Sequence, residues 1–174
     1  MKKILAVFFM LIICSGAAFA HEALGKWNKK ELNVYIENNR NAYLMKKAFG
    51  DWETATNKAI LFEIVENPSD ADIVVNFVDK CSDVAENAVG LTYPYVDRNG
   101  IFIKARIEIA KYPDEGKIKL SNLDLTKIMR HEIGHALGLN HTNIPYSIMN
   151  PTIDKGLNIT KDDIKIFKEI YKSK

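Results

Sequence analysis

The chain has 174 residues, of which 47% are hydrophobic and 26% are charged. A chain of this length and composition forms one domain with a substantial core and is too short for two such domains. Lys and Arg number 24 against 22 Asp and Glu, and this near balance excludes the strongly basic character of proteins that bind nucleic acid or anionic membranes.

The N-terminus has the three parts of a secretory signal peptide. Two lysines precede an apolar run over residues 4–13, and small residues end at Ala20. We therefore expect residues 1–20 to be a signal peptide and residues 21–174 to be the mature domain, secreted to the outside. A periplasmic or cell-surface location stays open. The apolar run is too short to span a bilayer, so no membrane attachment is expected after cleavage.

Cleavage also changes the charge and the cysteine content. It removes two lysines and no acid, which leaves 22 basic and 22 acidic residues. Ile13 precedes Cys14 where a lipoprotein signal needs a small residue, so we expect no lipid anchor. Cys81 is then the only cysteine, and no intrachain disulfide can form. We expect a partly buried free thiol there; a zinc-blocking role and a dimer link are the alternatives.

The first half of the mature chain reads as strands around one helix. Alternating apolar residues predict a strand over residues 32–36, and two further apolar runs predict strands over 61–65 and 72–78. Between the first two, residues 39–57 carry a helical apolar stripe that faces a sheet. The stripe consists of Met45, Ala48, Phe49, Trp52 and Ala55. Residues 67–70 form a turn before the third strand.

The second half continues with two strands and then two helices. Residues 88–95 and 101–110 read as strands joined by a turn over 97–100. Pro94 lacks a backbone N–H, which suits an edge strand. Two capping boxes, Ser121 with Asp124 and Thr160 with Asp163, start the last two helices. This order, with no internal repeat, favours a single α+β domain.

The strongest chemical signal is the stretch from His131 to His141. On a helix, His131 and His135 share one face and can bind one metal ion, with Glu132 beside them. Gly138 permits the left-handed conformation that ends the helix, so that His141 can supply a third nitrogen. Three protein ligands leave a fourth position for water, which distinguishes a catalytic zinc site from a structural one. A bare H-E-x-x-H can lie on a solvated helix face, but chance gives the longer pattern in about one chain of this length in 10⁵.

H-E-x-x-H-x-x-G-x-x-H followed by Met149 resembles the metzincin metallopeptidases. Within them the chain is similar to the matrixin branch, which contains the matrix metalloproteinases. Segments that resemble matrixin catalytic domains, in the family's order, are 48–52, 61–65, 71–77 and 160–164. The likeness covers residues 27–171. It implies the zincin (metzincin) fold, with a twisted, mostly parallel five-stranded sheet, an antiparallel edge strand and three helices.

The resemblance also implies a function and its residues. We expect a secreted zinc-dependent endopeptidase with one catalytic Zn²⁺ bound by His131, His135 and His141. Glu132 would be the general base, and Met149 an apolar floor below the histidines. The substrate would be a protein or peptide, bound as an extended strand along residues 89–94, from Val89 through Pro94. We expect a monomer. Specificity would depend on a pocket between the metal-binding helix and the loop over residues 151–159.

Differences between this sequence and other metzincin families indicate which branch it resembles. Pro151 stands where astacin-like and serralysin-like proteins have a tyrosine, and Thr142 stands where adamalysins have an aspartate. Both favour the matrixin branch. The matrixin cysteine-switch motif is absent from this sequence, so we expect latency, if any, to come from elsewhere. The only histidine outside the motif is His21, so a second, histidine-rich zinc site is not expected. Calcium stays open, because turn aspartates such as Asp97 are commonly solvated.

Other roles also stay open. The chain could be a narrowly specific processing or self-cleaving peptidase, or a non-catalytic zinc-binding protein on a zincin scaffold; the presence of Glu132 and all three ligands opposes the latter. As a free N-terminus, His21 could bind copper, which would need a second histidine nearby. The resemblance also allows the new terminus to dock on Asp162 or Asp163.

Overall fold

The computed structural model describes residues 23–81, 88–111, 119–151 and 158–172. Its centre is a five-stranded sheet with the order β2-β1-β3-β5-β4. The strands are β1 (Glu31–Ile36), β2 (Leu61–Val65), β3 (Ile73–Val78), β4 (Gly90–Val96) and β5 (Phe102–Ala110). All neighbouring pairs are parallel except β4 and β5. The predicted mostly parallel sheet with an antiparallel edge strand is therefore confirmed.

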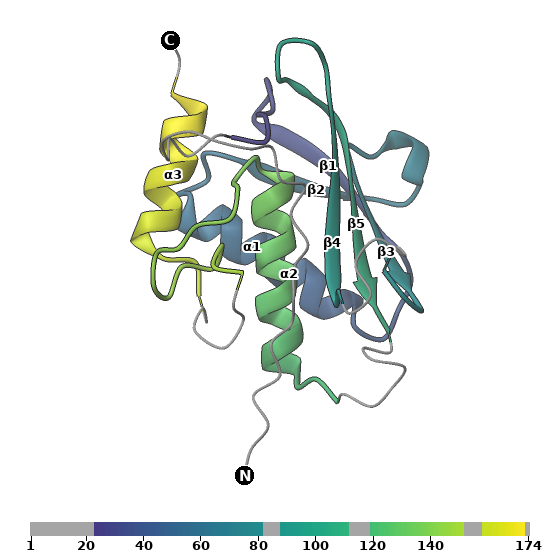
Figure 1. Cartoon of the computed structure of the whole chain (residues 1–174). Coiled ribbons are helices and arrows are strands. Elements are labelled where there is room, and N and C mark those ends of the chain that lie inside the picture. The colour runs from purple at the N-terminus through teal and green to yellow at the C-terminus, as the bar shows by residue number, and fades with distance from the viewer. Residues whose placement is uncertain (1–22, 82–87, 112–118, 152–157, 173–174) are drawn as a thin grey trace.

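Three helices accompany the sheet in the described residues: α1 (Ala42–Ala55), α2 (Asn122–Ala136) and α3 (Lys161–Tyr171). A short 3₁₀ helix, η1 (Pro68–Asp70), replaces the predicted turn before β3. Figure 1 shows α1 and α2 against one face of the sheet, with α2 between β4 and α3. None of the described helices has both the length and the apolar character that a membrane span needs.

The apolar stripe of α1 packs as predicted except at Ala55, which is only partly buried, and the helix is shorter than the pattern indicates. Met45, Ala48, Phe49 and Trp52 are all buried. The Asn39 side chain accepts a hydrogen bond from the Asn41 N–H (2.9 Å), which holds a turn where the pattern predicts helix. At the other end, the residues at 57 and 58 have positive φ and stop the helix. A local side-chain hydrogen bond therefore sets the first boundary, and the backbone conformation sets the second.

A partly buried ion pair joins α1 to α2. The Arg130 guanidinium donates to the Asp51 carboxylate at 2.6 and 2.8 Å and to the Asn158 side-chain oxygen at 3.1 Å. The Trp52 indole donates to the Arg130 carbonyl at 2.8 Å. Because Arg130 is adjacent to His131, these bonds fix the helix turn that carries the first histidine.

The C-terminal end of α2 is held from two other parts of the chain. Carbonyl groups at a helix end lack partners within the helix. Here the Trp27 indole donates to the Ala136 carbonyl (2.8 Å), and the Tyr171 hydroxyl donates to the Leu137 carbonyl (3.2 Å). Gly138 follows with φ +94°, and a side chain there would collide with the backbone oxygen of Gly25. Gly138 therefore ends the helix as predicted, and its small size also lets the N-terminal segment pass.

Cys81 is fully buried, not partly buried as the sequence suggested. Its thiol lies 3.7 Å from the Glu108 carbonyl. Burial, with the charges of Glu132 and Glu108 as further causes, raises the pKa of this thiol to about 12. A thiol that is buried and protonated is a poor nucleophile and cannot reach a second chain, so the structure favours the inert thiol over a dimer link.

Candidate metal centre

The helix α2 places His131 and His135 one turn apart on the same face. The predicted capping box is present: the Ser121 hydroxyl accepts from the Asp124 N–H (3.2 Å), and the Asp124 carboxylate accepts from the Ser121 N–H (3.2 Å). The helix then runs without interruption to Ala136. Both histidines are at least nine-tenths buried, so the metal-binding face of α2 points into the protein rather than into bulk water.

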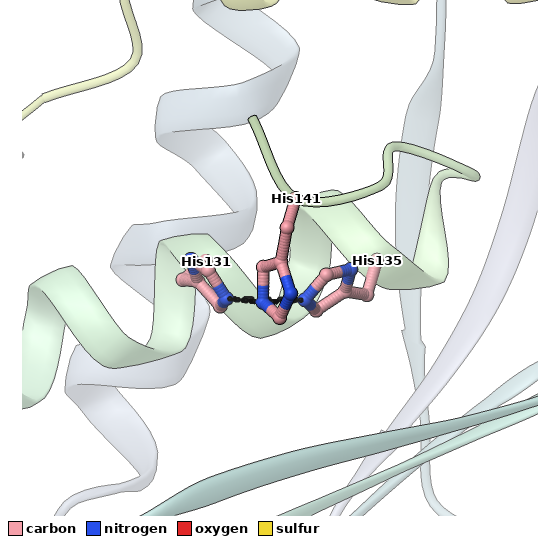
Figure 2. Close-up of side chains that lie close together, drawn as sticks. All are labelled: His131, His135 and His141. Atoms are coloured by element: carbon pink, nitrogen blue, oxygen red, sulfur yellow. Dashed lines mark hydrogen bonds between the residues drawn. The ribbon is translucent and has the colours of Figure 1, made fainter. Parts of the chain in front are cut away.

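The three histidines predicted as ligands come together. The Nε2 atom of His131 lies 3.0 Å from that of His135 and 3.1 Å from that of His141, and the last two are 3.2 Å apart. Figure 2 shows the three rings converging, two from α2 and one from the loop that follows it. These three residues form the one group of potential metal ligands found in the part of the chain that the structure describes.

Hydrogen bonds at the Nδ1 atoms of two rings determine which nitrogen of each ring carries the proton. The Nδ1 atom of His131 lies 2.7 Å from the Ile148 carbonyl, and that of His135 lies 2.9 Å from the Leu139 carbonyl. A carbonyl only accepts, so each Nδ1 must carry the proton and each Nε2 presents a lone pair. Two lone pairs facing each other at 3.0 Å repel, and a shared cation removes that repulsion. The donor set therefore fits a metal ion.

The distances between the three nitrogens and the charge state of the rings also fit zinc. Nitrogens bound tetrahedrally at zinc's usual distance of about 2.0–2.1 Å lie about 3.3 Å apart, close to the spacings seen here. Burial, followed by the effect of His141, lowers the pKa of His131 to about 3, and burial lowers that of His141 to about 4. The pKa of His135 is lowered as well, first by burial. All three rings are thus neutral at neutral pH, as metal ligands must be.

The loop that carries His141 is folded back by a buried carboxylate. Asp163 is fully buried and accepts from the Ser147 hydroxyl and from the Ile148 N–H (3.1 Å). It also accepts from the N–H and hydroxyl of Thr160, both at 2.7 Å, in the predicted capping box of α3. Asp163 therefore fixes Ile148, the residue whose carbonyl accepts from the His131 ring. The sequence predicted the capping role but not this second one, because its partners lie 15 and 16 residues away.

Met149 lies where the resemblance placed it. It is fully buried, and a Cβ built at Gly134 would collide with its sulfur. Gly134 stands between the two helical histidines, so the thioether packs directly against that turn of α2. The Met149 carbonyl accepts from the Thr142 N–H (3.1 Å), which closes the loop beside His141.

Glu132, the predicted base, is fully buried next to the edge strand β4. The Thr92 hydroxyl lies 2.7 Å from its Oε2 atom and 2.9 Å from its backbone carbonyl. Its Oε1 atom has no hydrogen-bond partner among the described residues. With no cation beside it, burial raises the pKa of this carboxyl to about 8, and the Thr92 hydrogen bond opposes the rise. A cation bound by the histidines would favour the charged carboxylate. No local pattern indicates this role of Thr92, because it lies 40 residues before Glu132 and contacts it only through the order of the strands.

Only some of the other residues predicted to take part in binding lie among those that the structure describes. Residues 89–94 include most of β4, which has a strand neighbour on one side only among the described residues. The segment 152–157 of the predicted pocket lies outside the described residues, and so does His21. Asp97 accepts from the backbone N–H groups of Asn99 (2.8 Å) and Ile101 (2.9 Å), which lowers its pKa and gives it a role in the turn.

Comparison with known proteins gives a consistent result. The matrixin family matches residues 26–172. The chain is 30% identical over 138 residues to metalloendoproteinase 2-MMP of Arabidopsis thaliana, covering 74% of this chain and 36% of that protein. It is 29% identical over 149 residues to karilysin of Tannerella forsythia, covering 72% and 29%. It is 28% identical over 109 residues to matrilysin of Rattus norvegicus, covering 58% and 40%.

The match leaves most of each relative uncovered, since it spans between 29% and 40% of their lengths. The family match over residues 26–172 contains all the parts described above: the helix with two histidines, the glycine turn, the third histidine and the buried methionine. With 26–172 matched by the family, the chain belongs to the matrixins.

Proposed function

We propose that the chain is a zinc-dependent endopeptidase. The observation that carries this proposal is the set of three Nε2 atoms within 3.0–3.2 Å of one another, beside a buried carboxylate with one unpartnered oxygen. Membership of the matrixin family supports it, and so do relatives named as metalloendoproteinases.

His131, His135 and His141 would bind the zinc ion. When bound, zinc supplies Lewis acidity, which lowers the pKa of water toward neutrality and polarises a peptide carbonyl. Glu132 supplies the base. Its Oε1 atom accepts a proton from the attacking water and later donates it to the departing amine, so that one peptide bond and one water give a carboxylic acid and an amine. The Oε2 atom remains bonded to Thr92 meanwhile.

The edge strand would bind the substrate. One side of β4 pairs with β5, and no other described strand pairs with its second side, where backbone groups would bind an extended peptide. Such pairing recognises the peptide backbone rather than particular side chains. It would position the scissile bond along α2, the helix that packs beside β4 (Figure 1).

We also propose that the protein is exported, with residues 1–20 as the signal peptide and residues 21–174 as the mature peptidase. The basic, apolar and small-residue order of the N-terminus supports this. N-terminal sequencing of the exported protein should begin at His21, whereas an exported chain that keeps Met1 would contradict the proposal.

The activity can be tested with residues 21–174, loaded with one equivalent of zinc, and an unfolded protein of mixed sequence as substrate. We expect cleavage at many internal sites, loss of cleavage when a chelator removes the zinc, and recovery when zinc is restored. Cleavage of a few sequences only, in a broad peptide library, would indicate a narrow processing peptidase. Zinc binding without cleavage of any library member would contradict the proposal and favour a non-catalytic zinc-binding protein.

A further inference from the structure

One face of β4 packs closely against the Glu132 side chain. Successive residues of a strand point to opposite faces, so Gly90 and Thr92 point the same way. A Cβ built at Gly90 would lie 2.7 Å from both Cγ and Oε1 of Glu132 and 2.7 Å from Ile128. Gly90 therefore faces α2 at Glu132, and only a residue without a side chain leaves room for the carboxylate. Two positions along, Thr92 provides a hydroxyl to the same group.

The hydroxyl of Thr92 has a single proton to donate and two acceptors within reach. Its distance to Oε2 of Glu132 is 2.7 Å, and its distance to the Glu132 carbonyl is 2.9 Å. A helical carbonyl already accepts from its own helix, and a carboxylate accepts more strongly than a neutral carbonyl. The proton therefore goes to Oε2. This leaves Oε1 as the carboxylate oxygen with no partner in the described structure.

We propose that Thr92 is a positioning residue, which holds the Glu132 carboxylate in one conformation with Oε2 occupied and Oε1 available for proton transfer. The inference rests on the function proposed above and adds a residue to it. Without the hydroxyl, Oε2 loses this hydrogen bond, and the carboxylate can rotate away from the observed conformation. A base displaced by about 1 Å can cost about 100-fold in rate, although nothing in the chemistry itself has changed.

Because Thr92 lies on β4, the strand proposed to pair with the peptide is also the strand that holds the base. The backbone of β4 would therefore fix the scissile bond and the carboxylate relative to each other. This predicts that loss of the Thr92 hydroxyl affects the chemical step and leaves substrate affinity unchanged.

The test compares Thr92→Val with Thr92→Ser in zinc-loaded residues 21–174. Valine keeps the branched shape that suits a strand and removes the hydroxyl; serine keeps the hydroxyl. We expect Thr92→Val to lower kcat by about 10- to 100-fold, with KM within about twofold of wild type. Thr92→Ser should stay within about threefold of wild type. Thr126→Val is the matched control, because it removes a buried hydroxyl that bonds the Asn122 carbonyl of α2 instead (2.7 Å).

A wild-type kcat in Thr92→Val, or an equal loss in Thr92→Ser, would overturn the inference. Crystal structures of the zinc-loaded wild type and Thr92→Val give a second readout that needs no activity. We expect one Glu132 conformer in the wild type. In the variant we expect a displaced side chain or two partly occupied conformers. If the wild type cleaves no peptide, the proposed activity fails, and these structures alone decide the positioning role. An unmoved carboxylate in Thr92→Val would then refute it.

Discussion

Glu132→Gln should lower kcat for peptide cleavage by about 10²- to 10⁴-fold, the range that a general base contributes. Glutamine has the shape of glutamate, and its side-chain oxygen can still accept from the Thr92 hydroxyl, as Oε2 does at 2.7 Å. Its amide cannot take a proton from water. The zinc ligands are untouched, so zinc content and melting temperature should stay near those of the wild type. Steady-state kinetics on a peptide that the wild type cleaves measures the loss.

Glu169→Gln makes the same chemical change at an exposed position on α3 and serves as the control. It should keep the wild-type rate. If Glu132→Gln, with its zinc bound, keeps more than half of the wild-type kcat, Glu132 is not the base. A loss of zinc from this variant would instead mean that Glu132 supports the metal site.

His141→Ala should weaken zinc binding by about 100-fold or more. Four-ligand zinc sites have apparent binding free energies of about 10–16 kcal/mol, so one ligand contributes about 3 kcal/mol, or roughly two orders of magnitude. The half-buried ring of His141 is the one ligand that does not come from α2, and Thr142 and Met149 hold its loop by a backbone bond of 3.1 Å. The metal-free variant should therefore melt close to the metal-free wild type. Titration against a competing chelator measures the affinity.

His21→Ala is the matched control, because His21 is the one histidine outside the motif. It should bind zinc as the wild type does. An equal loss of affinity in the two variants would show that His21 participates in the metal site. An unchanged affinity in His141→Ala would remove His141 from the ligand set.

The secondary structure could be predicted because its signals are local. The apolar run predicted over residues 72–78 forms β3, in which Ile73, Val75 and Phe77 are buried. The capping boxes begin α2 and α3 where the sequence indicates. The boundaries of α1 were less predictable, because they depend on the turn at Asn39 and on positive φ angles after its last turn.

The residues of the site also divide into those that a local pattern predicts and those that depend on contacts between elements. His131, His135 and Glu132 could be found because one helix turn sets their spacing, and Gly138 marks where the chain must reverse. Thr92 could not be found, because its contact with Glu132 depends on β4 being the outer strand beside α2. Likewise, the second role of Asp163 depends on how α3 packs under the loop. Contacts between elements need the order of the strands and the packing of the helices, which no local pattern contains.

Three imidazoles and no sulfur are expected to bind one zinc ion. X-ray absorption at the zinc edge, measured on residues 21–174 with one equivalent of zinc, tests this ligand set. The structure predicts three histidine nitrogens and one oxygen ligand at about 2.0–2.1 Å. A sulfur ligand at about 2.3 Å, from Cys81 or Met149, or fewer than three histidines would contradict it.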